Sequence, residues 1–192
     1  MKTIQVAKNK YVDEGHLCEV MTGGATTLKT RFAIAYTDTC LKVRIISETG
    51  GQTITPYSGV NVPVWHGDTV EFFVSPYGDE NWYFELNVAP NGACFYARIF
   101  NPNNREAFFH AEDESGVTAE ISMEKDIWTT ELTVPFSYVL KEGDEKKVKE
   151  LPWRFNVYRI DSAREEYAAF SPTGGQKANF HIPTEFAKMQ LV

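Results

Sequence analysis

The sequence has 192 residues, 43% of them hydrophobic, which is enough apolar mass for a substantial core in one domain spanning residues 1–192. Its formal net charge of −7 disfavours nucleic acid and anionic membrane surfaces as partners, because both attract basic proteins. No apolar run approaches the roughly 20 residues of a membrane-spanning helix. Three cysteines, an odd number without paired spacing, indicate neither a disulfide framework nor a zinc site.

The first ten residues contain no apolar segment of the kind found in secretory signals, since lysines and other polar residues interrupt them. We therefore expect a cytoplasmic protein, or an extracellular or periplasmic one if a signal has been removed. The sequence does not indicate an oligomeric state.

Alternation of apolar and polar residues with a period of two predicts about ten short antiparallel strands. The expected strands cover residues 30–36, 41–45, 69–75, 82–88, 95–99, 106–110, 117–123, 128–134, 153–157 and 186–191. Asn91-Gly92 is a strong hairpin signal, and one helical turn is expected at 135–140, where a proline begins it. Many short strands with little helix predict an all-β fold, a β-sandwich of the jelly-roll or immunoglobulin-like type.

The four tryptophans differ in their phase within these strands. Trp82, Trp128 and Trp153 alternate in step with other large apolar residues, so we expect all three in the core. Trp65 instead has the parity opposite to the apolar stripe of the strand that follows it. This predicts an exposed Trp65 at the edge of a pocket, with burial under the preceding long loop as the alternative.

Known catalytic motifs are absent from the sequence: it has no GxSxG, HExxH, Walker A or GxGxxG, and its four histidines lack metal-ligand spacing. Glu71, Glu85 and Glu131 each point to the polar face of a predicted strand. Two such acids on neighbouring strands could serve a glycoside hydrolase of the endo-xylanase type, because glycosidases need a carboxyl pair about 5–10 Å apart. Solubility explains polar strand faces equally well, so no catalytic residue is assigned.

An exposed tryptophan beside a carboxylate also suits the binding of a carbohydrate. An indole ring stacks on the C–H face of a pyranose, while a carboxylate accepts hydrogen bonds from its hydroxyls. Trp65 and Glu71 could contact one sugar if the chain bends between them, which Gly67 permits.

Several segments, in order, resemble family 9 carbohydrate-binding modules and their xylanase-associated relatives. The most informative is Trp65-His66-Gly67-Asp68-Thr69-Val70-Glu71-Phe72-Phe73, which is similar to the family's Trp-x-x-Asp-x-Val-Glu-hydrophobic-Phe stretch. The likeness continues through Tyr83-Phe84-Glu85-Leu86-Asn87, Trp128-Thr129-Thr130-Glu131, Trp153-Arg154-Phe155-Asn156-Val157-Tyr158 and Phe180-His181-Ile182-Pro183. It runs from about residue 30 to the C-terminus.

The resemblance implies a β-sandwich that grips the end of a sugar chain between two aromatic rings without cleaving it. Trp65 matches one ring, and Glu71 matches a hydrogen-bonding acid in the same motif, to which Asp68 also belongs. Phe180 stands at the position of the second ring. We expect Trp65, Glu71 and Phe180 to converge, because the glycine-rich loop at 171–178 is free to fold back toward the first two.

Two of the implied binding positions depart from the family pattern. Glu85 stands where the family has an arginine that contacts sugar, and Tyr158 stands where it has a glutamine. These departures leave the identity of the sugar open. Calcium is known in the family, but the sequence offers no acidic cluster to hold it, so no metal ligand or cofactor is assigned.

Three functions therefore remain in view at this stage. The leading one is non-catalytic recognition of a sugar or oligosaccharide end. The alternatives are the glycoside hydrolase acting through paired carboxylates and a protein-interaction sandwich that has kept the fold without a sugar ligand.

Overall fold

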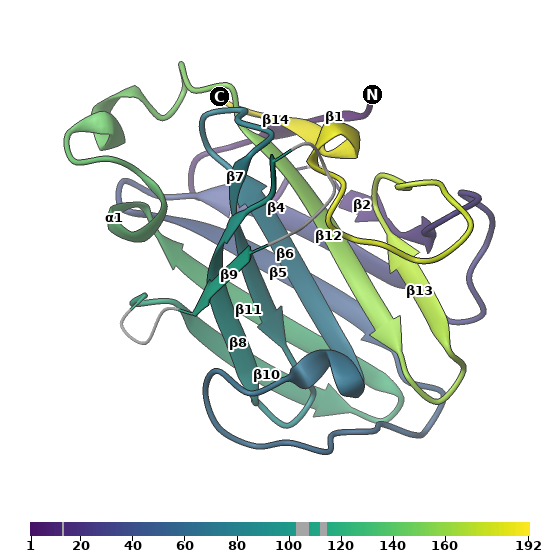
Figure 1. Cartoon of the computed structure of the whole chain (residues 1–192). Coiled ribbons are helices and arrows are strands. Elements are labelled where there is room, and N and C mark those ends of the chain that lie inside the picture. Colours follow the sequence, from purple (N-terminus) through teal and green to yellow (C-terminus); the bar gives the residue numbers. More distant parts are fainter. Residues whose placement is uncertain (13, 103–107, 112–114) are drawn as a thin grey trace.

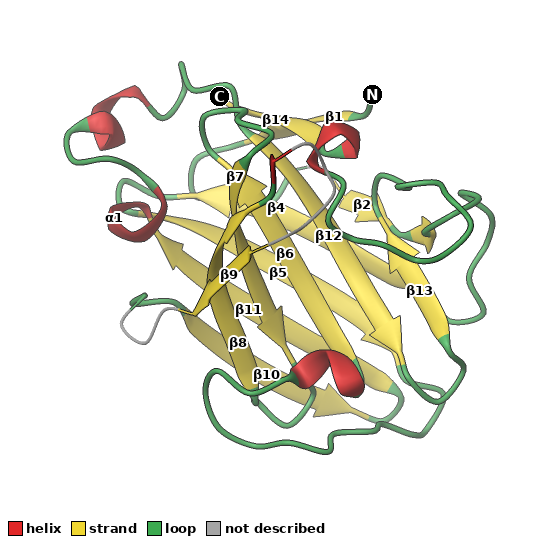
Figure 2. Ribbon diagram, viewed as in Figure 1, coloured by secondary structure: helices red, strands yellow, loops and turns green. Residues whose placement is uncertain are grey.

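The computed structural model describes residues 1–12, 14–102, 108–111 and 115–192, which form two β-sheets packed face to face (Figure 1). Helix is confined to short turns between strands (Figure 2). These are α1 (Phe136–Val139) and the 3-10 helices η1 (Val64–His66), η3 (Asp144–Lys147) and η4 (Pro183–Glu185). No helix in these ranges is long and apolar enough to cross a membrane. The architecture is the predicted β-sandwich.

The larger sheet contains nine strands within the described ranges. Its main path runs β1-β14-β12-β6-β7-β8-β9, while β13 pairs with β12 and β3 pairs with β13. Their bounds are β1 (Thr3–Val6), β3 (Cys18–Glu19), β6 (Thr69–Ser75), β7 (Trp82–Val88), β8 (Cys94–Phe100), β9 (Phe108–Ala111), β12 (Arg154–Asp161), β13 (Glu166–Ala169) and β14 (Ala187–Leu191). The pair β1 and β14 is parallel, unlike its antiparallel neighbours.

The smaller sheet has five strands in the order β10-β11-β5-β4-β2 and lies behind the larger one in Figure 1. Its bounds are β2 (Glu14–His16), β4 (Thr30–Tyr36), β5 (Cys40–Glu48), β10 (Thr118–Glu124) and β11 (Ile127–Pro135). All four pairings within it are antiparallel.

The predicted strands are present, although some begin or end at other residues than predicted. Strands β4 and β6 begin and end at the predicted residues, and α1 forms directly after Pro135 as expected. The strand expected at 106–110 falls partly outside the described residues, and the part that is described belongs to β9. The prediction missed β1, β2, β3 and β13 because each has four residues or fewer, too few for a period-two pattern.

The main hydrophobic core lies between the two sheets and is built from alternate residues of each strand. Strand β6 contributes Val70, Phe72 and Val74 to it. Trp128 and Trp153 are fully buried in the same core, as their phase predicts. Each buried indole of this kind stabilises the fold by roughly 3–5 kcal/mol, the usual cost of replacing one with alanine.

The outer face of the larger sheet is also covered, and this determines where a ligand can reach it. A second apolar cluster lies there, including Phe73, Tyr83 and Tyr158 from three adjacent strands. Every residue of β6 is therefore buried, although half of them point away from the main core. The polar face that alternation predicts on this strand is not a solvent face, because loops from elsewhere in the chain lie over it.

The predicted burial of Trp82 is wrong. Its side chain is 47% exposed and packs on Phe100, with 4.6 Å between the ring centroids. Exposure falls along the same face of β7, from Trp82 through the half-buried Phe84 to the fully buried Leu86. Parity correctly assigns the face of the sheet, but it does not show that the opposing sheet ends before it covers the first residue of the strand.

Candidate functional site

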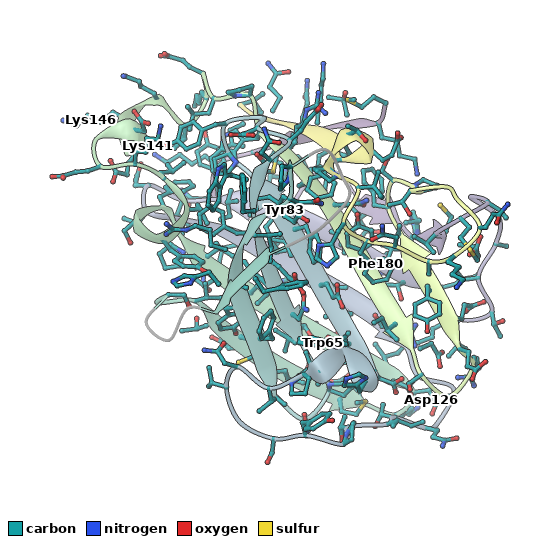
Figure 3. The ribbon with its side chains drawn as sticks, in the orientation of Figure 1. Trp65, Tyr83, Asp126, Lys141, Lys146 and Phe180 are labelled. Carbon is teal, nitrogen blue, oxygen red and sulfur yellow. The ribbon has the colours of Figure 1, made fainter. Side chains whose placement is uncertain are left out.

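A cavity of about 640 Å³ opens on the outer face of the nine-stranded sheet. This volume lies within the range of typical small-molecule sites. The residues on its walls that carry the following argument are Trp65, Glu71, Glu85, Phe109, Phe180 and His181. Figure 3 shows Trp65 and Phe180 on the viewer's side of this sheet, Trp65 from the segment before β6 and Phe180 from the loop after β13.

Trp65 stands at the rim of the cavity and is 39% exposed. It belongs to η1, whose first residue, Val64, is buried and anchors the turn. Its ring meets Phe95 edge-on, with 5.0 Å between centroids. Gly67 allows the bend through lack of a side chain, because a Cβ there would lie 2.5 Å from the Ile54 carbonyl oxygen. The ring is therefore supported on one side and open on another.

Phe109 is a second exposed ring of the cavity, and the sequence analysis did not identify it. Its side chain is 52% exposed, and its ring meets His181 edge-on at 5.2 Å. Phe109 lies opposite Ile99 in the pairing of β8 with β9, and Ile99 belongs to the outer cluster. Phe109 reaches the cavity because β9 is the edge strand of the larger sheet, and only the strand order shows this.

Phe180 lines the cavity as a wall and is not a freely exposed ring, contrary to the simple picture of two equivalent clamp rings. It is buried, and its ring stacks on Tyr158 with 4.2 Å between centroids and 7° between planes. The Tyr158 hydroxyl also donates a hydrogen bond to the Phe180 carbonyl oxygen at 2.9 Å. Tyr158 itself lies beneath Phe180 and supports it from β12.

The loop at 171–178 brings Phe180 to Trp65, as the sequence analysis expected. It is fastened at its start by Ser171 and Asn156, whose backbone and side-chain groups exchange hydrogen bonds of 2.8 and 2.9 Å. Gly174 and Gly175 then adopt φ values of 71° and 89°, a conformation that strongly favours glycine. Trp65, Glu71 and Phe180 thus line one cavity although they lie far apart in the sequence.

Glu71 and Glu85 lie together on the floor of the cavity. They project from the same face of adjacent strands, because Glu71 pairs with Asn87 and Glu85 pairs with Phe73. Their exposures are only 2% and 3%. Asn87 Nδ2 donates to Glu85 Oε1 at 2.6 Å, while Glu85 Oε2 has no hydrogen-bond partner in the part of the chain that the structure describes.

Burial controls the ionisation of these two acids. Removal from water raises the pKa of Glu85 to about 8, against a smaller lowering by the Asn87 hydrogen bond. It also raises the pKa of Glu71 well above its ordinary value, and the neighbouring Glu85 carboxylate raises it further. Without a ligand, Glu85 is therefore largely protonated at neutral pH.

His181 completes the polar floor through a fixed network. The Tyr83 hydroxyl lies 2.7 Å from His181 Nδ1, and Asn101 Nδ2 donates to both the Tyr83 hydroxyl and the His181 carbonyl oxygen. Burial lowers the pKa of His181 to about 4, so the ring is neutral. The other ring nitrogen, Nε2, lies 3.9 Å from Glu85 Oε2. That distance is too long for a hydrogen bond and leaves Nε2 available to a ligand.

Asp68, one of the expected binding residues, has a structural role. Its carboxylate accepts hydrogen bonds from the backbone N–H groups of Ile54 at 2.8 Å and Ser162 at 2.7 Å. It is buried and is not among the residues that line the cavity. Asp68 ties two loops to the start of β6 and so supports Trp65 indirectly.

Of the three acids considered for the hydrolase alternative, Glu131 is separated from Glu71 and Glu85. Glu131 lies on β11 in the other sheet and forms an ion pair with Arg44. Within the described ranges, no group of three or more His, Cys, Asp or Glu side chains could hold a metal ion.

Comparison with known proteins supports the fold assignment. No family model matches the chain. An "Extracellular protein" from Arthroderma benhamiae is 27% identical over 157 residues, which cover 71% of this chain and 66% of that relative, just under two thirds of its length.

Three solved structures share the architecture. A candidate carbohydrate-binding protein from Bacteroides uniformis superposes with a TM-score of 0.80 at 18% identity, covering 100% of this chain and 99% of the other. A family 9 carbohydrate-binding module from Caldicellulosiruptor kristjanssonii in complex with cellotriose has a TM-score of 0.67 at 14% identity, with coverage of 99% and 93%. One in complex with glucose, from the same organism, has a TM-score of 0.61 at 15% identity, with coverage of 100% and 96%. The chain therefore has the fold of the family 9 carbohydrate-binding modules.

Proposed function

We propose that this protein binds the end of a saccharide in the cavity on the outer face of its larger sheet. One observation carries the proposal: exposed rings of Trp65 and Phe109 stand at the same cavity whose floor holds buried polar groups. Aromatic rings offer stacking surfaces to the C–H face of a pyranose, and polar groups at the floor orient its hydroxyls.

Two polar groups at the floor can form hydrogen bonds with a sugar. Glu85 Oε2 has no hydrogen-bond partner among the described residues, and His181 Nε2, 3.9 Å away, is too far from it to be one. A hydroxyl both donates and accepts, so one sugar hydroxyl can satisfy the two groups together. The solved modules of this fold with bound cellotriose and glucose support the same class of ligand.

Binding without hydrolysis fits the positions of the acids better than catalysis does. Glycosidases place their two carboxyl groups on opposite sides of the scissile bond. Glu71 and Glu85 instead project side by side from one face of adjacent strands. Both therefore approach a ligand from the same side, as hydrogen-bonding groups would.

The test is calorimetric titration of the full chain with glucose, cellobiose, cellotriose and the corresponding xylose-based sugars. We expect saturable binding of at least one of them, competed by the free monosaccharide if the site takes a chain end. Xylan and association with polysaccharide breakdown belong to the same proposal, and the xylose-based sugars test them. Absence of binding to every sugar, including amino sugars, would remove the proposal in favour of a sandwich that contacts protein.

A further inference from the structure

The buried carboxylates at the floor of the cavity have no positive partner. Glu85 Oε2 is buried and makes no hydrogen bond to any described residue. Glu71 is equally buried beside it, and no described lysine or arginine forms an ion pair with either acid. The fold thus keeps two adjacent buried acids without a cationic side chain from the described residues beside them.

A buried carboxyl oxygen without a hydrogen-bond partner lowers the stability of the fold. A buried polar group without a partner costs roughly 1–3 kcal/mol, and more if it is charged. Asn87 Nδ2 donates to Glu85 Oε1 and so holds this side chain in place, yet Oε2 has no partner among the described residues, and Glu85 lines the cavity. A buried acid that is held in position with one oxygen unpaired is typical of a functional site.

The surroundings of the pair do not supply the missing charge. The other titratable groups packed around it are Tyr83 on β7, Tyr158 on β12, Glu165 in the turn after β12, Tyr167 on β13, and Lys177 and His181 in the following loop. Lys177 is exposed and makes no ion pair with either acid within the described chain. His181 is neutral because burial lowers its pKa to about 4. The described groups around the pair therefore supply no positive partner for a deprotonated Glu71 or Glu85.

We propose that the ligand of this cavity is a saccharide with a protonated amino group, a hexosamine, whose ammonium binds between Glu71 and Glu85. The inference rests on the proposed function, because the rings of Trp65 and Phe109 are needed to stack on the sugar. An ammonium offers three N–H donors and one positive charge, which complements two carboxylates better than a hydroxyl with a single donor. An N-acetylated sugar lacks the charge and has one N–H.

Binding of the ammonium has a proton balance that can be measured. Without a ligand, Glu85 holds a proton at neutral pH because burial raises its pKa to about 8. Burial, and after it the neighbouring Glu85, also raises the pKa of Glu71. A sugar ammonium replaces a proton as the positive partner, so that proton is released to the solvent. A neutral sugar leaves Glu85 protonated and releases none.

The experiment compares glucosamine, N-acetylglucosamine and glucose, together with their β-1,4-linked disaccharides, by calorimetric titration below the pKa of the sugar amine. We expect the amino form to bind roughly 10- to 100-fold more tightly than the other two, the scale of a charge-assisted hydrogen bond. Repetition in two buffers with different enthalpies of ionisation should show net proton release for the amino sugar alone.

Variants locate the effect within the site. Glu85→Gln and Glu71→Gln should reduce the ratio of amino-sugar to neutral-sugar affinity to within a few-fold of unity. The matched control is Glu165→Gln at the cavity wall, which should keep the preference. Circular dichroism and thermal melts establish that each variant is folded, and the isosteric glutamine removes a buried acid without leaving a void.

Each result decides a different statement. Equal or tighter binding of glucose would overturn the amino-sugar inference and leave the proposed function intact. The same is true if the preference persists in both Glu→Gln variants at the floor. Failure of every sugar to bind would overturn both statements.

Discussion

The ring of Phe180 lies flat on the ring of Tyr158, 4.2 Å away, and its carbonyl oxygen accepts a hydrogen bond from the Tyr158 hydroxyl. Two contacts from one side chain thus hold the loop that closes one side of the cavity. Because Tyr158 projects from β12, in the middle of the larger sheet, the position of the loop is set by the sheet. Substitutions of Tyr158 should therefore change the affinity for a ligand even though Tyr158 does not line the cavity.

Tyr158→Phe should lower the free energy of unfolding by about 1–2 kcal/mol, because it removes one hydrogen bond and leaves a buried carbonyl oxygen unsatisfied. It should also weaken sugar binding, since the loop loses a tether. Tyr36→Phe is the matched control: its hydroxyl donates to the Val192 carbonyl oxygen at 2.8 Å, away from the cavity. Denaturant unfolding and calorimetric titration of both variants check this. Equal effects on binding would show that the tether has no specific role.

Trp65→Ala should abolish detectable sugar binding and change the free energy of unfolding by less than about 1 kcal/mol, because a partly exposed ring contributes little to the core. Trp82→Ala is the control, since Trp82 is exposed to a similar degree and does not line this cavity. It should leave binding unchanged. Titration and thermal melts of the two variants give the answer, and loss of the fold in Trp65→Ala would contradict the assignment of this ring to the rim.

The stability of the protein should fall as the pH rises from about 6.5 to 8. Burial raises the pKa of Glu85 from 4.5 to about 8, so the folded state holds a proton that the unfolded state has released. That stabilisation is complete below the unfolded pKa and is lost as the pH passes through the folded pKa. The slope is at most about 1.4 kcal/mol per pH unit for each proton. Glu71 acts in the same direction.

Glu85→Gln should flatten this dependence and stabilise the protein at pH 8. Measurements above pH 6.5 exclude the opposite contribution of His181. Burial lowers the pKa of His181 from 6.5 to about 4, so its contribution to stability is lost only as the pH falls below 6.5. Glu131→Gln is the control, because Glu131 forms a partly exposed ion pair with Arg44 on the other sheet. Urea unfolding at several pH values measures the slopes, and an unchanged slope in Glu85→Gln would refute the account.

Gly67→Ala should destabilise the fold and weaken sugar binding together. A Cβ at this position would lie 2.5 Å from both the Ile54 carbonyl oxygen and the Pro56 Cδ, so η1 must shift and carry Trp65 with it. Overpacking of this kind typically costs roughly 1–3 kcal/mol. Gly24→Ala is the control, since its Cβ would meet only the Thr22 hydroxyl oxygen, at 3.2 Å. Tryptophan fluorescence should report the displacement of Trp65. Denaturant unfolding measures the loss of stability, and calorimetric titration measures the loss of sugar binding.

No hydrolysis of xylan or of aryl glycosides is expected from the purified chain. Glu71 and Glu85 project from the same face of adjacent strands, and Glu131 is on the other sheet. Reducing-sugar and chromogenic assays are sensitive here, because glycosidases accelerate a very slow reaction by many orders of magnitude. Turnover that disappears in Glu71→Gln would contradict the binding assignment.

The candidate site was predictable only in part. Alternation with a period of two was enough to single out Trp65 and Glu71, because both residues lie in one short stretch of sequence. Phe109 and His181 were missed, since each reaches the cavity through an edge strand or a loop. Asp68 shares the motif with Trp65, yet its carboxylate serves the backbone of two other loops.

The sequence by itself determined the β-sandwich and the residues of its main core, because alternation along a strand is a local property that assigns each side chain to a face. Only the tertiary structure decided what covers each face. On the outer side of β6, His181 and Phe186 from the distant C-terminal segment pack on Phe73, while Trp82 at the start of β7 stays exposed. Strand order likewise set Glu71 beside Glu85 and separated both from Glu131. Neighbours across a sheet come from long-range pairing, which no periodicity within one strand can encode.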